Sequence, residues 1–373
     1  MSKPLDKVGF LVHSRDLRDF KRKFPILKYF PERALLFLTK LAPPIVVSKI
    51  TGLVSAEGSP VEGFVLGIPM TAKQMMEDRA AALRKIKQAV RLAERKGVGI
   101  IGLGALTASF SRGGLDVAGT TKVGVTTGRA YTVKTVTEYV LHAVGLFGID
   151  LGNVRIAIVG AAGAIGSGCA KILAKHGVRN FLLIDLERKA EHLKRHMEDI
   201  TGRHLGARIE ISHRIGDIKG WDIVIAATNA PEVLIKPDDL LPGAIVVNDA
   251  QPSDISPEVL DMDDTLVIEG GVIRTPGISC NFNMGLARRN DNFCCLGEAL
   301  VLAHQGRFAD FALGELDMKL IEEITAKAKT LNMTISEIQN ARGIVPEEKI
   351  ARIREAIRLR EAERIAAKIS VSP

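Results

Sequence analysis

The sequence predicts an α/β protein of two domains with helices closing its C-terminal part. The chain has 373 residues, enough for two domains of ordinary size, and 46% hydrophobic with 25% charged residues is typical of a globular protein. Between residues 149 and 279, continuous apolar runs alternate with helical patterns. Such runs are typical of a parallel sheet whose two faces are covered by helices. A glycine-rich turn after the first run indicates where that sheet would bind a ligand.

Residues 1–148 are expected to form an N-terminal α/β domain that holds a substrate. Apolar runs predict strands, and apolar residues at helical spacing predict helices. Gly97 follows the longest helical pattern and is expected to end it. The predicted strands are Val8–Val12, Val61–Ile68 and Val98–Leu103, and the predicted helices are Thr71–Lys96 and Tyr131–Val144.

Residues 149–279 carry the strand and helix order of a Rossmann dinucleotide-binding domain. The glycine-rich turn joins the strand Val154–Val159 to a helix that begins near Ala164. In such a turn the first glycine permits the tight bend, the second lets the backbone approach a pyrophosphate, and the third allows close helix packing. Amide groups and the helix dipole then face the anion. The residues expected to bind the cofactor here are Gly160, Ala162, Gly163, Ala164, Ile165 and Gly166.

An acidic residue and a second turn extend this expected cofactor site. Asp185 follows the strand Phe181–Ile184, where a carboxylate can accept hydrogen bonds from the ribose hydroxyls of NAD. It would repel a 2′-phosphate, so NAD(H) is favoured, while Arg188 beside it leaves NADP(H) open. The turn after the strand Ile223–Ala227 is expected to line the nicotinamide side, through Ala227, Thr228 and Asn229.

Residues 280–335 are expected to form helices that cover the cleft between the domains and carry a nucleophile. Cys295 lies near the start of a helix predicted over Asn292–His304, where the helix dipole favours a thiolate. A thiolate can attack a thioester and hold the acyl group covalently. Glu298 lies one turn further and could orient a proton relay or form a salt bridge. A buried cysteine more often serves as a small apolar residue, so this pattern leaves both roles open.

Two further residues are candidates for catalysis. Thr127, in the turn Thr126–Gly128, could help to polarise a carbonyl or could belong to a helix N-cap. His13 follows the first strand and could donate a proton, although a structural hydrogen bond is the commoner role. His192 and His196 have metal-ligand spacing, but no third ligand accompanies them, and no metal site is predicted.

Charge and cysteine usage narrow the class of protein. The net charge of +8 suits an acidic carrier protein, an acidic small molecule or an anionic membrane surface, and nucleic acid is not the expected partner. Four cysteines without a paired spacing indicate reduced thiols and a cytoplasmic protein. No apolar run is long enough to cross a bilayer. The charged tail 336–373 is expected to be a solvated helix that packs weakly or against a partner, and a homo-oligomer stays open.

Motifs spread along both domains resemble those of the long-chain acyl-[acyl-carrier-protein] reductases of cyanobacteria. The resemblance implies reduction of a fatty acyl thioester, carried by acyl carrier protein or CoA, to a fatty aldehyde through an acyl-enzyme at Cys295. The segments that carry it are Ala42–Val47, Thr51–Gly52, Gly102–Ala105, Thr126–Gly128, Gly160–Gly166, Glu269–Gly271 and Phe293–Ala299.

The sequence departs from that family at positions that bear on the cofactor and the site. At the position of Ile184–Leu186, the family has a segment similar to Ile-Ala-Arg, whose arginine suits NADPH. This chain lacks that arginine, which puts a preference for NADPH in doubt. Arg129–Thr132 also differs from the family's pattern after the Thr-Thr-Gly turn. The alternatives are a dehydrogenase of another carbonyl, alcohol or imine that uses no cysteine, and a protein that binds NAD(H) without turnover.

Overall fold

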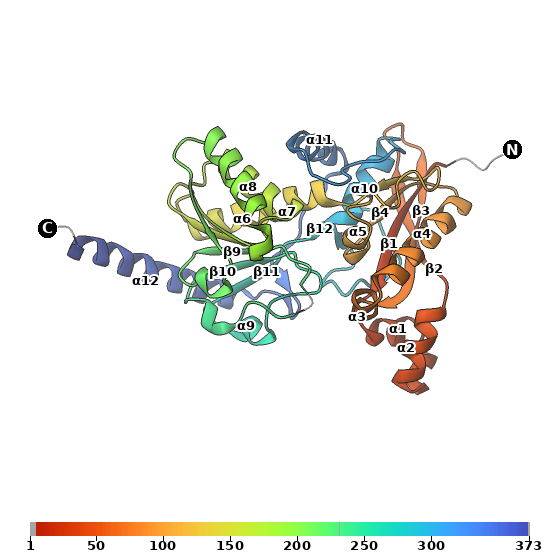
Figure 1. Ribbon diagram of the computed structural model, residues 1–373, viewed down its shortest axis with the longest axis horizontal. Helices are drawn as coiled ribbons and strands as arrows, with labels where there is room; N and C mark the ends of the chain where they lie inside the picture. The colour runs from red at the N-terminus through yellow and green to blue at the C-terminus, as the bar shows by residue number, and fades with distance from the viewer. Residues whose placement is uncertain (1–4, 231, 372–373) are drawn as a thin grey trace. The chain divides into compact units, whose positions relative to one another are not determined.

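The computed structural model describes residues 5–230 and 232–371, and it divides them into two compact units (Figure 1). The first unit extends to Thr132 and resumes over Val272–Thr334, and the second holds Val133–Gly271 and the chain from Ile335 onward. The division therefore passes through the helix α6 (Arg129–Phe147), whereas the sequence suggested a boundary at 148, just after that helix. It also assigns the tail to the second unit.

The first unit is built on a five-stranded sheet with the order β2-β3-β1-β4-β5. Strand β1 runs parallel to β3 and β4, and β4 runs parallel to β5, while β2 is antiparallel to β3. The expected α/β character of this half is thereby confirmed. The strands are β1 (Lys7–Ser14), β2 (Ile45–Val54), β3 (Pro60–Thr71), β4 (Val98–Leu103) and β5 (Gly124–Thr126).

Helices of the first unit follow these strands, and one of them differs from expectation. The helix predicted over Thr71–Lys96 is divided into α3 (Ala72–Glu77) and α4 (Arg79–Arg95). The Asp78 carboxylate accepts the Ala81 amide and caps α4, so the chain starts a new helix there. The other helical segments of the first half are α1 (Leu17–Lys23), η1 (Pro25–Tyr29), α2 (Glu32–Leu41) and α5 (Leu106–Phe110).

The returning part of the first unit adds a small sheet and two helices. Strand β13 (Asp291–Phe293) pairs antiparallel with β12 (Val272–Arg274), in a small sheet with the order β13-β12-β14. The helix predicted from Asn292 therefore begins later, because Asn292 and Phe293 are held in the strand. The remaining elements are α10 (Cys294–His304), α11 (Met318–Ala328), η5 (Lys329–Leu331) and β14 (Thr334–Ile335).

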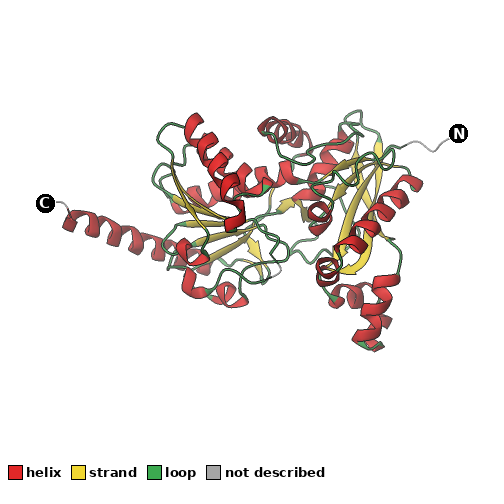
Figure 2. Ribbon diagram, viewed as in Figure 1, coloured by secondary structure: helices red, strands yellow, loops and turns green. Residues whose placement is uncertain are grey.

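The second unit contains a six-stranded parallel sheet with the order β11-β10-β9-β6-β7-β8. This is the doubly wound order of a Rossmann fold, with its switch point between β6 and β9. Figure 1 shows α7 and α8 on one side of the sheet and α9 on the other, and Figure 2 shows the helices flanking the strands. The predicted Rossmann fold is confirmed. The strands are β6 (Arg155–Val159), β7 (Asn180–Ile184), β8 (Arg208–Ser212), β9 (Ile223–Ala226), β10 (Ile245–Asn248) and β11 (Leu266–Glu269).

Short connections complete the second unit. The helix expected near Glu187–Asp199 begins as a 3-10 turn and continues as α8 to Arg203. The helices are α7 (Ala164–Lys175), α8 (Ala190–Arg203) and α9 (Pro257–Asp261). The 3-10 turns are η2 (Glu187–Lys189), η3 (Ile215–Ile218) and η4 (Pro237–Asp239), and a two-stranded ribbon joins β15 (Gln339–Asn340) to β16 (Gly343–Ile344).

The tail forms the helix α12 (Glu347–Val371), and it packs more firmly than its composition suggests. Ile350, Ile353 and Ile357 are buried along one face of the helix. Arg360 is buried as well and lies 2.9 Å from the Asp222 carboxylate, within the same unit. The expectation of a weakly packed, solvated tail is therefore wrong for this part of the helix. Among the described helices, none has both the length and the apolar character needed to cross a membrane.

Candidate functional site

The first turn of α10 carries Cys295, in contact with the turn that begins α6. Gly128 has φ +73°, and a Cβ at this position would lie 2.3 Å from both Cα and Cβ of Cys295. Only glycine allows the two backbones to approach this closely. Every residue of α10 is buried except Cys295, which is partly exposed. The fold therefore presents this one thiol at the start of an otherwise buried helix.

The start of α10 has no side-chain cap, since Phe293 at the N-cap offers no acceptor. The first amides of a helix carry a partial positive charge that attracts an anion. Strand β4 packs closely against this turn: a Cβ at Gly102 would lie 3.3 Å from the Cys295 carbonyl oxygen. The arrangement suits a thiolate at Cys295.

The Glu298 carboxylate lies against the start of α6. It is fully buried and accepts the Gly128 amide at 3.0 Å and the Tyr131 amide at 2.8 Å. The Thr126 hydroxyl also donates to it. Burial raises the pKa of Glu298 to about 7, against the effect of these hydrogen bonds. Glu298 thus holds the turn that contacts Cys295.

Cys294 is buried and belongs to a separate hydrogen-bond chain. The Thr132 hydroxyl donates to the Gly128 carbonyl at 2.8 Å and lies 3.0 Å from the Cys294 sulfur. Since that hydroxyl has one proton, the Cys294 thiol is the donor of the second bond. Elsewhere, burial raises the pKa of the Cys280 thiol to about 12 and that of Cys169 well above its ordinary value.

The side chains of Thr127 and His13 are engaged with backbone groups of the first unit. The Thr127 hydroxyl donates to the Ala312 carbonyl at 2.9 Å, so its proton is not directed at a substrate. The His13 ring lies 3.0 Å from the Ser14 carbonyl through Nδ1, and its Nε2 lies 3.4 Å from the Leu106 amide. Burial lowers the pKa of His13. These contacts fit a neutral imidazole whose two nitrogens face backbone groups.

The glycine loop of the second unit has the geometry that its spacing predicts. Gly160 has φ +85°, and a Cβ there would lie 2.5 Å from the Ala227 carbonyl oxygen. A Cβ at Gly166 would lie 2.5 Å from the Gly160 carbonyl oxygen, which requires a glycine for close packing. At Gly163 a Cβ would meet only that oxygen, at 3.2 Å, so space remains beside the backbone. Since α7 has no side-chain cap at Gly163, its first amides can hold a phosphate.

Asp185 lies beside this loop at the end of β7. Its carboxylate accepts the Ala162 amide at 3.0 Å, and Lys189 pairs with it at 3.3 Å. Arg188 is exposed in η2.

Burial lowers the pKa of His196 on α8, and the charge of Lys171 adds to the effect. Within residues 5–230 and 232–371, no group of three potential ligands is arranged to hold a metal ion.

The turn after β9 is held by the loop that follows β10. The Thr228 hydroxyl donates to Asp254 at 2.8 Å and accepts the Ala230 amide at 3.1 Å. Ala227 and Thr228 are partly exposed, and Asn229 is exposed. Sequence patterns did not point to Asp254, which lies 26 residues from its partner. Thr126 was likewise missed as the partner of Glu298, 172 residues away.

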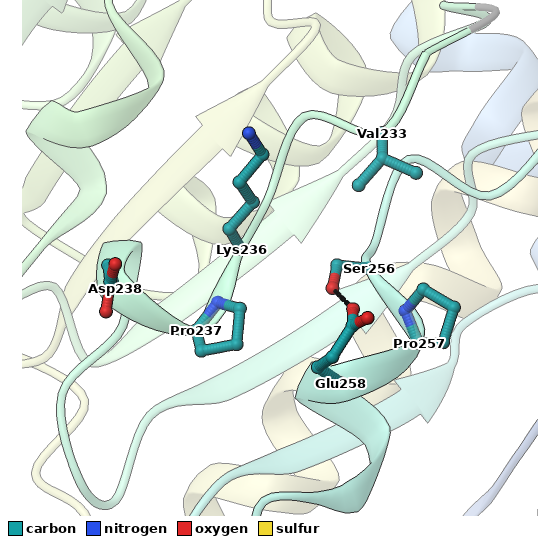
Figure 3. Close-up of a pocket in the computed structure, with 7 residues that line it drawn as sticks. All are labelled: Val233, Lys236, Pro237, Asp238, Ser256, Pro257 and Glu258. Carbon is teal, nitrogen blue, oxygen red and sulfur yellow. Dashed lines mark hydrogen bonds between the residues drawn. The ribbon is translucent and has the colours of Figure 1, made fainter.

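An open hollow of about 560 Å³ lies further along the same unit, between η4 and α9 (Figure 3). In Figure 3 the Ser256 hydroxyl faces the Glu258 carboxylate, and Lys236 lies across the pocket from them. None of the residues predicted from the sequence lines it. The lining residues are Val233, Lys236, Pro237, Asp238, Ser256, Pro257 and Glu258.

Comparison with known proteins relates the second unit to a dehydrogenase family. The model of the Shikimate / quinate 5-dehydrogenase family matches residues 143–269, which contain the glycine loop and the six-stranded sheet. Shikimate 5-dehydrogenase from Listeria monocytogenes, solved with shikimate and NAD, is 12% identical and has a TM-score of 0.37, over 86% of this chain and 96% of its own. Entamoeba histolytica malic enzyme is 13% identical with a TM-score of 0.40, over 96% and 77%.

Two curated relatives match most of the chain. Aminotransferase PigE of Serratia sp. is 26% identical over 324 residues, which is 83% of this chain and 37% of PigE. The present chain thus spans little more than a third of that relative. The long-chain acyl-[acyl-carrier-protein] reductase of Synechococcus elongatus is 26% identical over 322 residues, 82% of this chain and 91% of its own length. The resemblance inferred from the motifs is confirmed by the match to this reductase. The Rossmann sheet and the family-model match indicate that the second unit is a dinucleotide-binding domain of the dehydrogenase type.

Proposed function

We propose that this protein reduces an acyl thioester to an aldehyde through an acyl-enzyme at Cys295. One observation carries the proposal: Cys295 is the single partly exposed residue of the buried helix α10, and it lies at the helix start that no side chain caps. A thiolate is stabilised at such a position, and a thiolate is the form that attacks a carbonyl. The similarity to an acyl-[acyl-carrier-protein] reductase supports the same substrate class.

The covalent step exchanges one thioester for another. The Cys295 sulfur bonds to the carbonyl carbon while the bond to the substrate sulfur breaks, and the carrier leaves as a thiolate that takes a proton from water. Cys295 is the second residue of α10, and the uncapped first amides of this helix are suited to stabilise the negative charge that develops on the carbonyl oxygen. The Thr127 hydroxyl is not assigned this role, because it donates to Ala312.

Glu298 acts in this proposal as a positioning residue. Its carboxylate accepts hydrogen bonds from two amides and a hydroxyl at the start of α6. These bonds hold Gly128 in place against Cys295. A reacting sulfur displaced by as little as 1 Å can lose about a hundredfold in rate. His13 is not needed as an acid, since both of its ring nitrogens face backbone groups.

The second unit would hold the dinucleotide. The pyrophosphate would lie against Gly163 and the first amides of α7, where the loop leaves space. The Asp185 carboxylate would accept hydrogen bonds from the ribose hydroxyls. When bound, a reduced nicotinamide supplies the hydride that releases the acyl group as an aldehyde. The Asp185 carboxylate disfavours a 2′-phosphate, so NADH is the proposed cofactor, although Lys189 offsets part of that charge.

Aldehyde release tests the proposal. Purified protein is incubated with a long-chain acyl-CoA or the matching acyl carrier protein thioester, with NADH or NADPH, and the aldehyde is measured. Wild type should form aldehyde, and Cys295→Ala should lose at least about a thousandfold in rate. Cys294→Ala is the matched control, because its thiol bonds to Thr132 and should retain most activity. Equal rates for Cys295→Ala and wild type would refute the covalent mechanism.

A further inference from the structure

Residues 15–41, which form α1, η1 and α2, carry a concentration of exposed apolar side chains in the first unit. Eight of the sixteen large apolar residues that are exposed, among those whose burial is described, lie between residues 24 and 41. Tyr29 is 88% exposed, Ile26 68%, Leu41 65% and Phe37 64%. Figure 1 shows α1 and α2 projecting from the end of the five-stranded sheet of their own unit. Contiguous exposure of this kind marks an interaction surface.

The exposure of α2 does not arise from a loosely attached helix. Its inner face is packed, since Leu35 and Thr39 are both buried. The Gln74 amide donates to the Leu36 carbonyl at 2.6 Å, and Lys85 donates to the carbonyl of Ala42, which follows the helix. The opposite face, with Phe37 and Leu41, is therefore directed to solvent by a fixed helix.

Basic residues are interleaved with these apolar side chains. The 27 residues from 15 to 41 contain eight lysines and arginines and three acidic residues, a net charge of +5 against +8 for the whole chain. Lys28 in η1 and Arg33 in α2 are both exposed. Apolar and aromatic groups that insert between lipid tails, combined with cations that meet the headgroups, are characteristic of an interfacial membrane segment.

We infer that residues 15–41 dock this protein on the surface of an anionic lipid bilayer. Phe37, Leu41, Ile26 and Tyr29 would enter the headgroup layer, and Lys28 and Arg33 would contact lipid phosphates. An acidic protein partner would use the cations but would leave this many exposed apolar groups unexplained, so the lipid surface is favoured. Since bilayer binding needs no turnover, vesicle sedimentation without cofactor or substrate tests this surface separately from the thioester chemistry.

The test is sedimentation of the full chain with vesicles of phosphatidylcholine alone or mixed with phosphatidylglycerol, at low and high salt. The protein should sediment with the anionic vesicles, less with the neutral ones, and less at high salt because exposed charges are screened. The double variant Phe37→Glu with Leu41→Glu should bind at least about tenfold more weakly, since it loses two inserted groups and gains two repelled charges. Leu205→Glu, at a residue 97% exposed in the second unit, is the control and should bind like wild type.

A second pair of variants separates charge from apolar contact. Lys28→Glu with Arg33→Glu should weaken binding to anionic vesicles, whereas Lys194→Glu with Arg195→Glu, on exposed positions of α8, changes the net charge equally and should not. Failure to sediment with anionic vesicles would overturn the inference, as would equal binding by the Phe37/Leu41 variant. If that variant instead converted a wild-type dimer into a monomer in size-exclusion chromatography without vesicles, the occupant would be a second copy and the inference would be wrong.

Discussion

Helices α6 and α10 begin in contact with each other, with Gly128 packed against Cys295, but the two starts are equipped differently. The start of α6 is filled by the buried Glu298 carboxylate, which accepts amides of Gly128 and Tyr131. The start of α10 has no side-chain cap and carries a partly exposed thiol. The contrast teaches that the start of α6 serves as an anchor. It holds the start of α10 at a position where the Cys295 thiolate can form.

A third helix start, that of α7 in the second unit, resembles α10 in this respect. Gly163 gives it no side-chain cap and leaves space beside the backbone. We therefore expect substitutions at α6 and α10 to change the reaction of the thiol, and substitutions at α7 to change cofactor binding.

Breaking the contact between the α6 and α10 starts should have the largest effect. Gly128→Ala would place a methyl group 2.3 Å from Cys295 at a residue with φ +73°, so the α10 start must shift. We expect a loss of at least about a hundredfold in aldehyde formation and about 3 kcal/mol in the free energy of unfolding. Gly119→Ala is a matched control, with φ +72° and no neighbour within 4 Å, and should cost about 1 kcal/mol. Rates and urea unfolding of both variants measure this, and equal losses would contradict the contact.

Changing the anchor itself should have a smaller effect that depends on pH. The pKa of Glu298 is raised to about 7, above its ordinary value of 4.5, so the folded protein binds more protons than the unfolded chain between these values. The free energy of unfolding from this group therefore falls as pH rises from about 4.5 to 7, by up to about 3 kcal/mol.

Glu298→Gln removes this titration and leaves an amide N–H₂ facing backbone donors. It should be destabilised, and the difference from wild type should be about 2 kcal/mol larger at pH 5 than at pH 8. Urea unfolding of both proteins at the two pH values measures the difference. A destabilisation independent of pH would show that Glu298 does not titrate in this range.

A methyl group at the start of α7 should weaken binding of the cofactor and leave the protein folded. In Gly163→Ala the Cβ would meet only the Gly160 oxygen, at 3.2 Å, so a shift of a few tenths of an ångström in that backbone would accommodate it. It would occupy space that a pyrophosphate needs, and NADH should bind about tenfold more weakly. Gly202→Ala, with no neighbour within 4 Å, is the control. Fluorescence titration with NADH distinguishes them, and unchanged binding by Gly163→Ala would argue against a phosphate at this turn.

The smallest predicted effect concerns the choice of dinucleotide. Asp185→Asn keeps an acceptor for the Ala162 amide but removes the negative charge beside the loop. The ratio of the Kd for NADPH to that for NADH should fall by about threefold to tenfold. If the ratio stays constant, Lys189 already neutralises Asp185 and the preference has another origin.

The sequence predicted the parts of this molecule that depend on local spacing. The loop Gly160–Gly166 and Asp185 could be identified because a strand, a turn and a helix follow one another along the chain. The six-stranded parallel sheet followed from continuous apolar runs for the same reason. Contacts between distant segments could not be predicted. Glu298 meets Thr126 across 172 residues, and no spacing rule connects them.

Tertiary context also decided where α10 begins and how the tail packs. Pairing of β13 with β12 holds Asn292 and Phe293 in a strand, which moves the start of α10 to Cys294 and so places Cys295 in its first turn. The Asp222 carboxylate draws Arg360 of α12 into a buried ion pair, although the charged composition of the tail favoured solvent.

The most direct test of the account is the intact mass of the protein after exposure to an acyl-CoA without any dinucleotide. Wild type and Cys294→Ala should each gain the mass of one acyl group, and Cys295→Ala should gain none. Hydroxylamine should then remove the added mass, as expected for a thioester. An unmodified wild type, or an equal adduct on Cys295→Ala, would contradict the claim that the uncapped start of α10 holds the nucleophile.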